Sequence, residues 1–296
     1  MALSRDTNPD VLVGAPEANV GRVDAGGVRL HVETRGEGDP ILIIGAADED
    51  AEIYRGIAER LAGTNTVVTY DRRGTGRSDR NGWPTDSARH AGDAAALIKE
   101  LGLVRPTVLG TSAGGIVALR LALRHPERLG AVVCFEPGVF HVAEGGDEFR
   151  DAVERAVSDH LSTHPGDWEG ASDVLGRVAA SSIDDMTSLF SPPAGKDWYA
   201  HRSAAEAEAL IKGDLPLTGE RFDLGAVAGC PLPLAFSYGT SSLPMFRQIA
   251  ENLAATRGEL PLALPGVGHS IFYHPDEAVT YLRHVMATRA SRPNST

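Results

Sequence analysis

The 296-residue sequence has little of what marks secreted, membrane or metal-binding proteins. It holds two cysteines, Cys134 and Cys230, which lie too far apart for a metal pattern and form no disulfide framework, so both are predicted to be reduced packing residues. No run of about 18 apolar residues is present, and the first 20 residues lack a basic segment followed by an apolar one. We therefore expect a cytoplasmic protein with no membrane partner.

Basic residues are also in the minority, with 28 Lys and Arg against 40 Asp and Glu and a formal net charge of −12. This balance disfavours a large basic surface and so argues against nucleic acid or anionic membrane as the main partner. A small neutral or cationic ligand fits better, and the oligomeric state stays open, a homo-oligomer included. The 10 histidines show no H-E-x-x-H or comparable spacing, so neither a metal nor another cofactor is expected.

Short apolar runs alternate with helix-length amphipathic segments, which predicts an α/β fold with a mostly parallel sheet and helices on both faces. The predicted strands are 28–33, 41–44, 66–70, 107–110, 131–135, 232–237 and 260–264, and the predicted helices are 50–62, 86–101, 113–124, 244–256 and 276–288. The strand signal stops between 138 and 228, where amphipathic pieces such as 148–161 and 203–212 predict an inserted helical cap. The expected organisation is a core of 21–137 and 229–288, a cap of 138–228, and loose termini at 1–20 and 289–296.

The stretch VLGTSAGG, residues 108–115, places Ser112 between two glycines in the pattern G-x-S-x-G. A nucleophilic serine between a strand and a helix sits on a sharp turn that requires small neighbours, which is what this pattern supplies. An apolar strand precedes it and an apolar helix follows. Ser112 is therefore the candidate nucleophile, and the alternative is an elbow kept for packing alone.

From about residue 28 to 285 the chain resembles the α/β-hydrolase superfamily. The resemblance rests on the serine turn and on three phrases, YDRRGTGRS (70–78), RHPERLGAVV (124–133) and LPGVGHSIFYHP (264–275). His269 follows the last predicted strand, in a loop over the carboxyl edge of the sheet from which an imidazole could reach Ser112. His274 precedes Pro275 and is predicted to start the final helix.

The expected oxyanion hole combines the backbone N–H of Ala113, at a helix start, with a second N–H from the loop after 41–44. Most relatives have His-Gly in that loop, whereas this chain has Gly45-Ala46-Ala47-Asp48. Ala47 is the expected second donor and Ala46 the alternative. Asp48 is predicted to be solvated or to cap the helix that begins near residue 50.

The acid is missing from its usual place, because Ser242 stands where most relatives carry an aspartate after the strand that follows the cap. One strand earlier, Glu136 directly follows the buried run 131–135, at the edge where catalytic groups gather. A serine cannot stabilise an imidazolium as a carboxylate does, so Glu136 is the predicted acid. The alternative is a structural glutamate that either caps the entrance of the cap domain or pairs with an arginine such as Arg150.

This relocation resembles the zearalenone-type lactonases and related actinobacterial hydrolases, in which the acid follows the strand before the cap; the closer match covers 131–137 and 231–250. It implies a cofactor-independent serine hydrolase of esters or lactones acting through an acyl-enzyme, with a macrocyclic lactone such as zearalenone as one candidate. Aromatic residues of the cap (Phe140, Phe190, Trp198 and Tyr199), together with Met186, suggest a small hydrophobic substrate. The alternatives are a carbon–carbon bond hydrolase or perhydrolase with the same triad, and a non-catalytic ligand receptor on a hydrolase scaffold.

Overall fold

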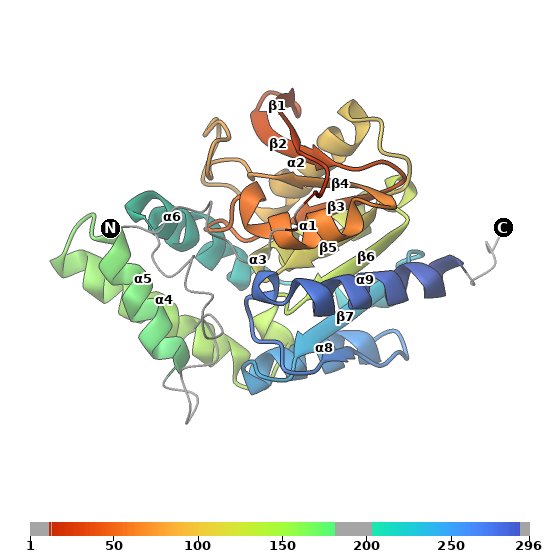
Figure 1. Cartoon of the computed structure of the whole chain (residues 1–296). Coiled ribbons are helices and arrows are strands. Elements are labelled where there is room, and N and C mark those ends of the chain that lie inside the picture. The colour runs from red at the N-terminus through yellow and green to blue at the C-terminus, as the bar shows by residue number, and fades with distance from the viewer. Residues whose placement is uncertain (1–11, 13, 181–202, 291–296) are drawn as a thin grey trace.

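In the computed structural model, which describes residue 12 and residues 14–180 and 203–290, one sheet of eight strands forms the centre of the molecule (Figure 1). The strand order is β1-β2-β4-β3-β5-β6-β7-β8. Only the pairings of β2 with β1 and β4 are antiparallel, and the other strands run parallel, as the sequence predicted. The strands are β1 (Asn19–Asp24), β2 (Arg29–Arg35), β3 (Asp39–Ile44), β4 (Asn65–Tyr70), β5 (Thr107–Thr111), β6 (Ala131–Phe135), β7 (Leu234–Gly239) and β8 (Leu262–Leu264).

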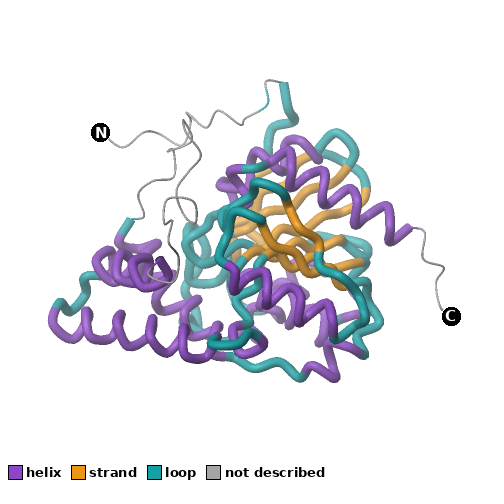
Figure 2. The backbone as a smooth tube through the Cα atoms, turned by 90° about the horizontal axis from the view of Figure 1, so that it is seen from below, coloured by secondary structure: helices purple, strands orange, loops and turns teal. Residues whose placement is uncertain are grey.

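Helices cover both faces of the sheet (Figure 2). One hydrophobic cluster joins the sheet to α2 (Ser87–Glu100), α3 (Ala113–Arg124) and α8 (Pro244–Ala255), and a second joins it to α1 (Arg55–Leu61) and α9 (Pro275–Ala290). Successive strand residues alternate between the clusters, because side chains of a strand point to opposite faces. Val108 belongs to the first cluster and Leu109 to the second. Strands buried on both faces explain why these segments read as continuous apolar runs.

Between β6 and β7 the chain forms helices that lie together beside the sheet (Figure 1), and we call the described part of residues 138–228 the inserted segment. It contains η4 (Phe140–Val142), α4 (Gly146–Thr163), α5 (Trp168–Ala180), α6 (Ala204–Ala209), a π-helical turn η7 (Leu210–Asp214), η8 (Leu215–Gly219) and α7 (Leu224–Ala228). The segment has a small hydrophobic cluster of its own, formed by Val153, Val157, Ala171 and Ile211. Phe140 packs against Phe246 of α8, with ring centroids 6.0 Å apart. The other predicted cap residues, Met186, Phe190, Trp198 and Tyr199, lie outside the described residues.

Three local features differ from what the sequence predicted. Strand β1 was not predicted, and the helix expected at 50–62 is divided into a 3₁₀ turn, η2 (Ala51–Tyr54), and α1. The cap of η2 is Asp50, whose carboxylate accepts the Ile53 N–H at 3.2 Å. The prediction for Asp48 was wrong: this side chain is neither solvated nor the helix cap, since the residue is 4% exposed and lies in the wall of the cavity described below.

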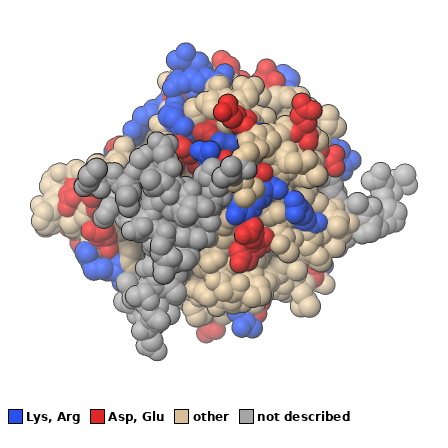
Figure 3. All heavy atoms as spheres, viewed as in Figure 1, with Lys and Arg blue, Asp and Glu red and all other residues tan. Residues whose placement is uncertain are grey.

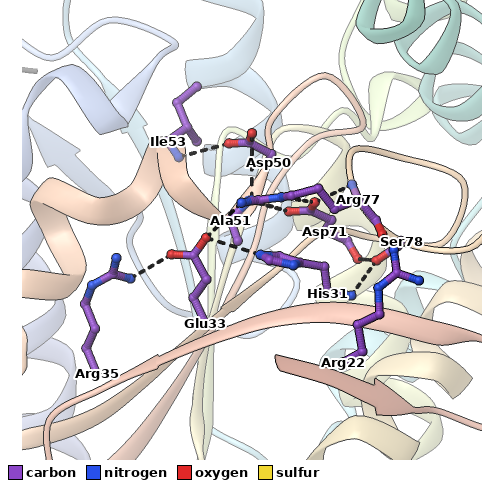
Figure 4. Close-up of polar contacts among 10 residues, drawn as sticks. All are labelled: Arg22, His31, Glu33, Arg35, Asp50, Ala51, Ile53, Asp71, Arg77 and Ser78. Atoms are coloured by element: carbon purple, nitrogen blue, oxygen red, sulfur yellow. Dashed lines mark hydrogen bonds and ion pairs between the residues drawn. The ribbon is translucent and has the colours of Figure 1, made fainter. Parts of the chain in front are cut away.

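A polar network fixes the loop that follows β4 (Figure 4). The fully buried Asp71 carboxylate accepts the Ala51 N–H at 2.7 Å and the Arg77 N–H at 2.6 Å. The Ser78 hydroxyl donates to the Asp71 carbonyl at 2.6 Å and accepts the His31 N–H at 2.8 Å. This network connects β2, β4 and η2, and so holds in place the loop after β4. The second residue of this loop, Arg72, contacts a residue of the candidate active site described below.

Acidic and basic side chains are interspersed on the face shown in Figure 3. Among residues 14–180 and 203–290, no helix combines the length and the hydrophobicity that crossing a membrane requires. Both cysteines are buried and unbridged, as predicted.

Candidate active site

Ser112 occupies a strained turn between β5 and α3. Its φ of 52° and ψ of −121° lie in a region that side-chain-bearing residues rarely adopt. The flanking glycines are required by close packing: a Cβ on Gly110 would lie 2.4 Å from the Gly114 carbonyl oxygen, and one on Gly114 would lie 2.1 Å from the Ile44 carbonyl oxygen. The pattern G-x-S-x-G therefore permits this turn to pack directly against the end of β3.

Glu136 occupies the equivalent place one strand further along the sheet. The Ser112 N–H donates to the Phe135 carbonyl at 3.0 Å, and the Glu136 N–H donates to the Ser237 carbonyl at 2.9 Å, so each residue continues its strand by one hydrogen bond. Glu136 also has a positive φ, 45°, and its side chain is 0% exposed. Both residues thus lie at the carboxyl edge of the parallel strands, where ligands bind in open α/β sheets.

His269 joins these two residues in one hydrogen-bonded chain. Its Nδ1 lies 2.6 Å from Glu136 Oε2 and its Nε2 lies 3.1 Å from Ser112 Oγ. The contact predicted between His269 and Glu136 is therefore present. The ring stacks on Phe246 with centroids 4.5 Å apart, which restricts its orientation. With the proton on Nδ1, Nε2 is unprotonated and can accept the serine proton.

Ser242 supports the carboxylate instead of replacing it. Its hydroxyl donates to Glu136 Oε2 at 2.7 Å, and the Gly239 N–H donates to Oε1 at 2.8 Å. Arg150, the alternative partner of Glu136, pairs with Asp147 and Asp151 in the inserted segment. His274 accepts the first backbone hydrogen bond of α9 from the Ala278 N–H, which confirms its predicted place at the helix start.

The predicted oxyanion donors have carboxylates beside them. The Ala46 N–H donates to Glu49 Oε2 at 2.9 Å, and the Ala47 N–H donates to Asp214 Oδ2 at 2.5 Å. Ala113 begins α3, where backbone N–H groups have no partner within the helix. Ala46, Ala47 and Ala113 as oxyanion donors remain a prediction.

A cavity of about 400 Å³ opens above Ser112 and His269. The apolar residues of its wall come from the inserted segment and from the α/β part of the chain. Phe140, Phe149, Val153 and Leu215 belong to the inserted segment, and Leu243 and Phe272 to the α/β part. Most ligand pockets are apolar with a few polar groups, whereas the wall of this cavity also contains several charged residues: Asp48, Glu49, Arg150, Asp173, Arg177 and Asp214. The described residues contain no group of three or more side chains suited to hold a metal ion.

Three charged residues of the site were missed from the sequence: Glu49, Arg72 and Asp214. Burial raises the pKa of Glu49 above its ordinary value, and nearby Asp48 raises it further. Burial also raises the pKa of Asp214, although the Arg72 guanidinium opposes this shift. The only sequence signal for Asp214 is a single carboxylate in the mainly apolar stretch LIKGDLPL (210–217). Arg72 lies in the segment YDRRGTGRS (70–78), where no pattern marks it as a residue of the site.

The chain belongs to the alpha/beta hydrolase fold family, whose model matches residues 39–275. One curated relative is the uncharacterized hydrolase YraK of Bacillus subtilis, which is 32% identical over 150 residues, 49% of this chain and 54% of the relative. Another is the putative carbamate hydrolase RutD of Azorhizobium caulinodans, which is 36% identical over 104 residues, 35% of this chain and 39% of the relative. The matched part thus spans about half or less of each of these relatives.

Solved structures agree on the fold. An esterase from Thermogutta terrifontis superposes with a TM-score of 0.73 at 18% identity, covering 92% of this chain and 99% of the esterase. An enzyme that degrades N-acyl homoserine lactones gives a TM-score of 0.69 at 20% identity, covering 89% and 99%. At such identities these likenesses establish the fold alone.

Proposed function

We propose that this protein is a cofactor-independent serine hydrolase of carboxylic esters or lactones, with Ser112, His269 and Glu136 as its triad. The observation that carries the proposal is the continuous chain of contacts from Ser112 Oγ through His269 to the buried carboxylate of Glu136. Nucleophile, base and orienting group are recognised by such geometry and not by sequence position.

In this mechanism Ser112 Oγ attacks the substrate carbonyl while His269 Nε2 takes the serine proton. Glu136 holds the other ring N–H and stabilises the imidazolium. Collapse of the tetrahedral intermediate breaks the ester C–O bond, and His269 gives the proton to the leaving alkoxide oxygen. Water, deprotonated by His269, then attacks the acyl-enzyme and releases the carboxylic acid and free Ser112.

For the substrate class we propose a small-molecule ester or lactone with a hydrophobic acyl part. The apolar residues of the cavity wall support this choice, as does the position of the inserted segment over the serine, which fits its role as a cap. A macrocyclic lactone of the zearalenone type is one candidate, supported by the placement of the acid after β6.

The test uses purified protein, a fluorophosphonate probe and a panel of p-nitrophenyl esters and lactones. The expected result is labelling of Ser112 and turnover that disappears in Ser112→Ala, whose thermal unfolding matches wild type because an elbow hydroxyl contributes little to packing. Absence of labelling in folded protein would reject the nucleophile. A Ser112→Ala variant that keeps more than about a hundredth of wild-type kcat would also reject it, since loss of a triad member costs far more than this.

The alternatives give other outcomes of the same panel. A carbon–carbon bond hydrolase would label at Ser112, because it uses the same groups, but would turn over an added diketone faster than every ester. A perhydrolase would also label at Ser112, but with hydrogen peroxide added it would transfer the acyl group of an ester to the peroxide, giving a peracid, in preference to water. A non-catalytic receptor would bind ligand without turning it over and would not label.

A further inference from the structure

The strongest unassigned feature is Asp214, a carboxylate of the inserted segment that sits on the predicted oxyanion donor. Asp214 ends the π-helical turn η7 and is 3% exposed. Its Oδ2 accepts the Ala47 N–H at 2.5 Å, although the two residues lie 167 positions apart in the chain. Its Oδ1 accepts a hydrogen bond from Arg72 Nη2. One carboxylate therefore divides its two oxygens between a backbone donor and a guanidinium.

Arg72 uses only part of its hydrogen-bonding capacity in this pair. The guanidinium is 1% exposed, and no acceptor among the described residues lies within hydrogen-bond distance of its Nε or Nη1. An arginine presents its donors as a planar fork that suits both oxygens of one carboxylate. Arg72 therefore has donors available for the second oxygen of Asp214, the one that now accepts from Ala47.

An N–H group has one hydrogen and cannot serve a carboxylate and a developing oxyanion equally well. Two anions at the same donor would also repel each other in a site of low dielectric constant. We propose that Asp214 determines access to the oxyanion hole: an acyl substrate gains the Ala47 N–H only when Asp214 Oδ2 leaves it for the unused donors of Arg72. This inference rests on the proposed hydrolase function.

The position of Asp214 connects this exchange to the size of the substrate. Leu210 and Leu215, which bracket the turn, both line the cavity together with Asp214. A long acyl chain fills more of this cavity than an acetyl group does, and so would press more on this turn. Arg72, in contrast, belongs to the loop held by the Asp71 network (Figure 4), so the movement falls to Asp214. The exchange of the Asp214 hydrogen bond from Ala47 to Arg72 would therefore favour large substrates over small esters.

The experiment compares wild type, Asp214→Asn and the double variant Arg72→Met/Asp214→Ala on p-nitrophenyl acetate and p-nitrophenyl decanoate. The neutral amide binds Ala47 more weakly than a carboxylate, because charge-assisted hydrogen bonds are about twice as strong as neutral ones. The double variant removes both charges, so that no unpaired buried charge is left if the single variant folds poorly. The control is Asp159→Asn, which makes the same change at an exposed residue of α4 in the inserted segment, outside the cavity wall.

The expected result is a rise of about tenfold in kcat/KM for the acetate, with little change for the decanoate, in at least one folded Asp214 variant and no such rise in Asp159→Asn. Equal changes for both esters, or a loss of activity that follows a loss of thermal stability, would overturn the proposal and leave Asp214 a structural residue. Fluorophosphonate labelling of wild-type Ser112 separates the two hypotheses: without labelling the hydrolase proposal fails, and with labelling but no change in chain-length preference only the role of Asp214 fails.

Discussion

Replacing Glu136 by glutamine is the most demanding test of the site, because the neighbours of the carboxylate dictate how the amide must sit. The Gly239 N–H donates to Oε1 at 2.8 Å, so the amide oxygen has to take that side. The amide NH₂ group then replaces Oε2, which lies 2.6 Å from His269 Nδ1. The opposite rotamer would bring two donors together in a fully buried place, at a cost of about 1–3 kcal/mol.

This orientation forces the wrong tautomer on His269. An NH₂ group facing Nδ1 requires Nδ1 to accept, so the ring proton moves to Nε2, which then cannot take the proton of Ser112. The imidazolium also loses its counter-charge. In a serine protease the analogous change lowers kcat on the order of 10⁴, which corresponds to about 5 kcal/mol in the activation free energy.

The assay is steady-state hydrolysis of p-nitrophenyl decanoate, with thermal unfolding measured in parallel. Glu251→Gln serves as the control, since Glu251 forms an exposed ion pair with Arg247 on α8, away from the site. A Glu136→Gln enzyme that folds and keeps more than about a tenth of wild-type kcat would show that the carboxylate neither fixes the tautomer nor stabilises the cation.

Three further predictions concern a neighbour of Glu136, the buried His90, and the close packing of the serine turn. Ser242→Ala removes one donor to Glu136 but leaves the others, so kcat should fall by no more than about tenfold; a loss as large as that of Glu136→Gln would make Ser242 essential. Burial holds the pKa of His90 well below its ordinary value, and the charges of Arg72 and Arg73 lower it further, so below about pH 6.5 the unfolded chain binds a proton at His90 that the folded protein does not. Below that pH the free energy of unfolding, measured in urea, should fall by about 1.4 kcal/mol per pH unit more in wild type than in His90→Gln. The same pH dependence of stability in both proteins would refute this. Gly114→Ala should lower the free energy of unfolding by about 2 kcal/mol or more, because the added Cβ would lie 2.1 Å from a backbone oxygen of β3. The control is Gly92→Ala in α2, where nothing lies within 4 Å of the added Cβ, so that thermal unfolding should show no loss of stability or a gain.

Local pattern was enough to predict the frame of the site. Apolar runs bounded by turn residues located seven of the eight strands, and their order placed the residues that follow β5 and β6 at one edge of the sheet. Ser112 was found from its G-x-S-x-G turn between an apolar strand and an apolar helix, and Glu136 because it directly follows a buried strand. Strand β1 escaped prediction because it is largely exposed, so that its sequence lacks an apolar run.

The tertiary structure alone decided what surrounds the predicted oxyanion hole. Asp48 is buried and Asp214 accepts from Ala47, and neither follows from local periodicity, because both depend on how the inserted segment packs on the loop after β3. Sequence pattern reports which residues share a face or a strand end, since those relations repeat at short spacing. A contact between residues 167 positions apart is set by the closure of the whole fold, and at the active site that contact places a carboxylate on the proposed oxyanion donor.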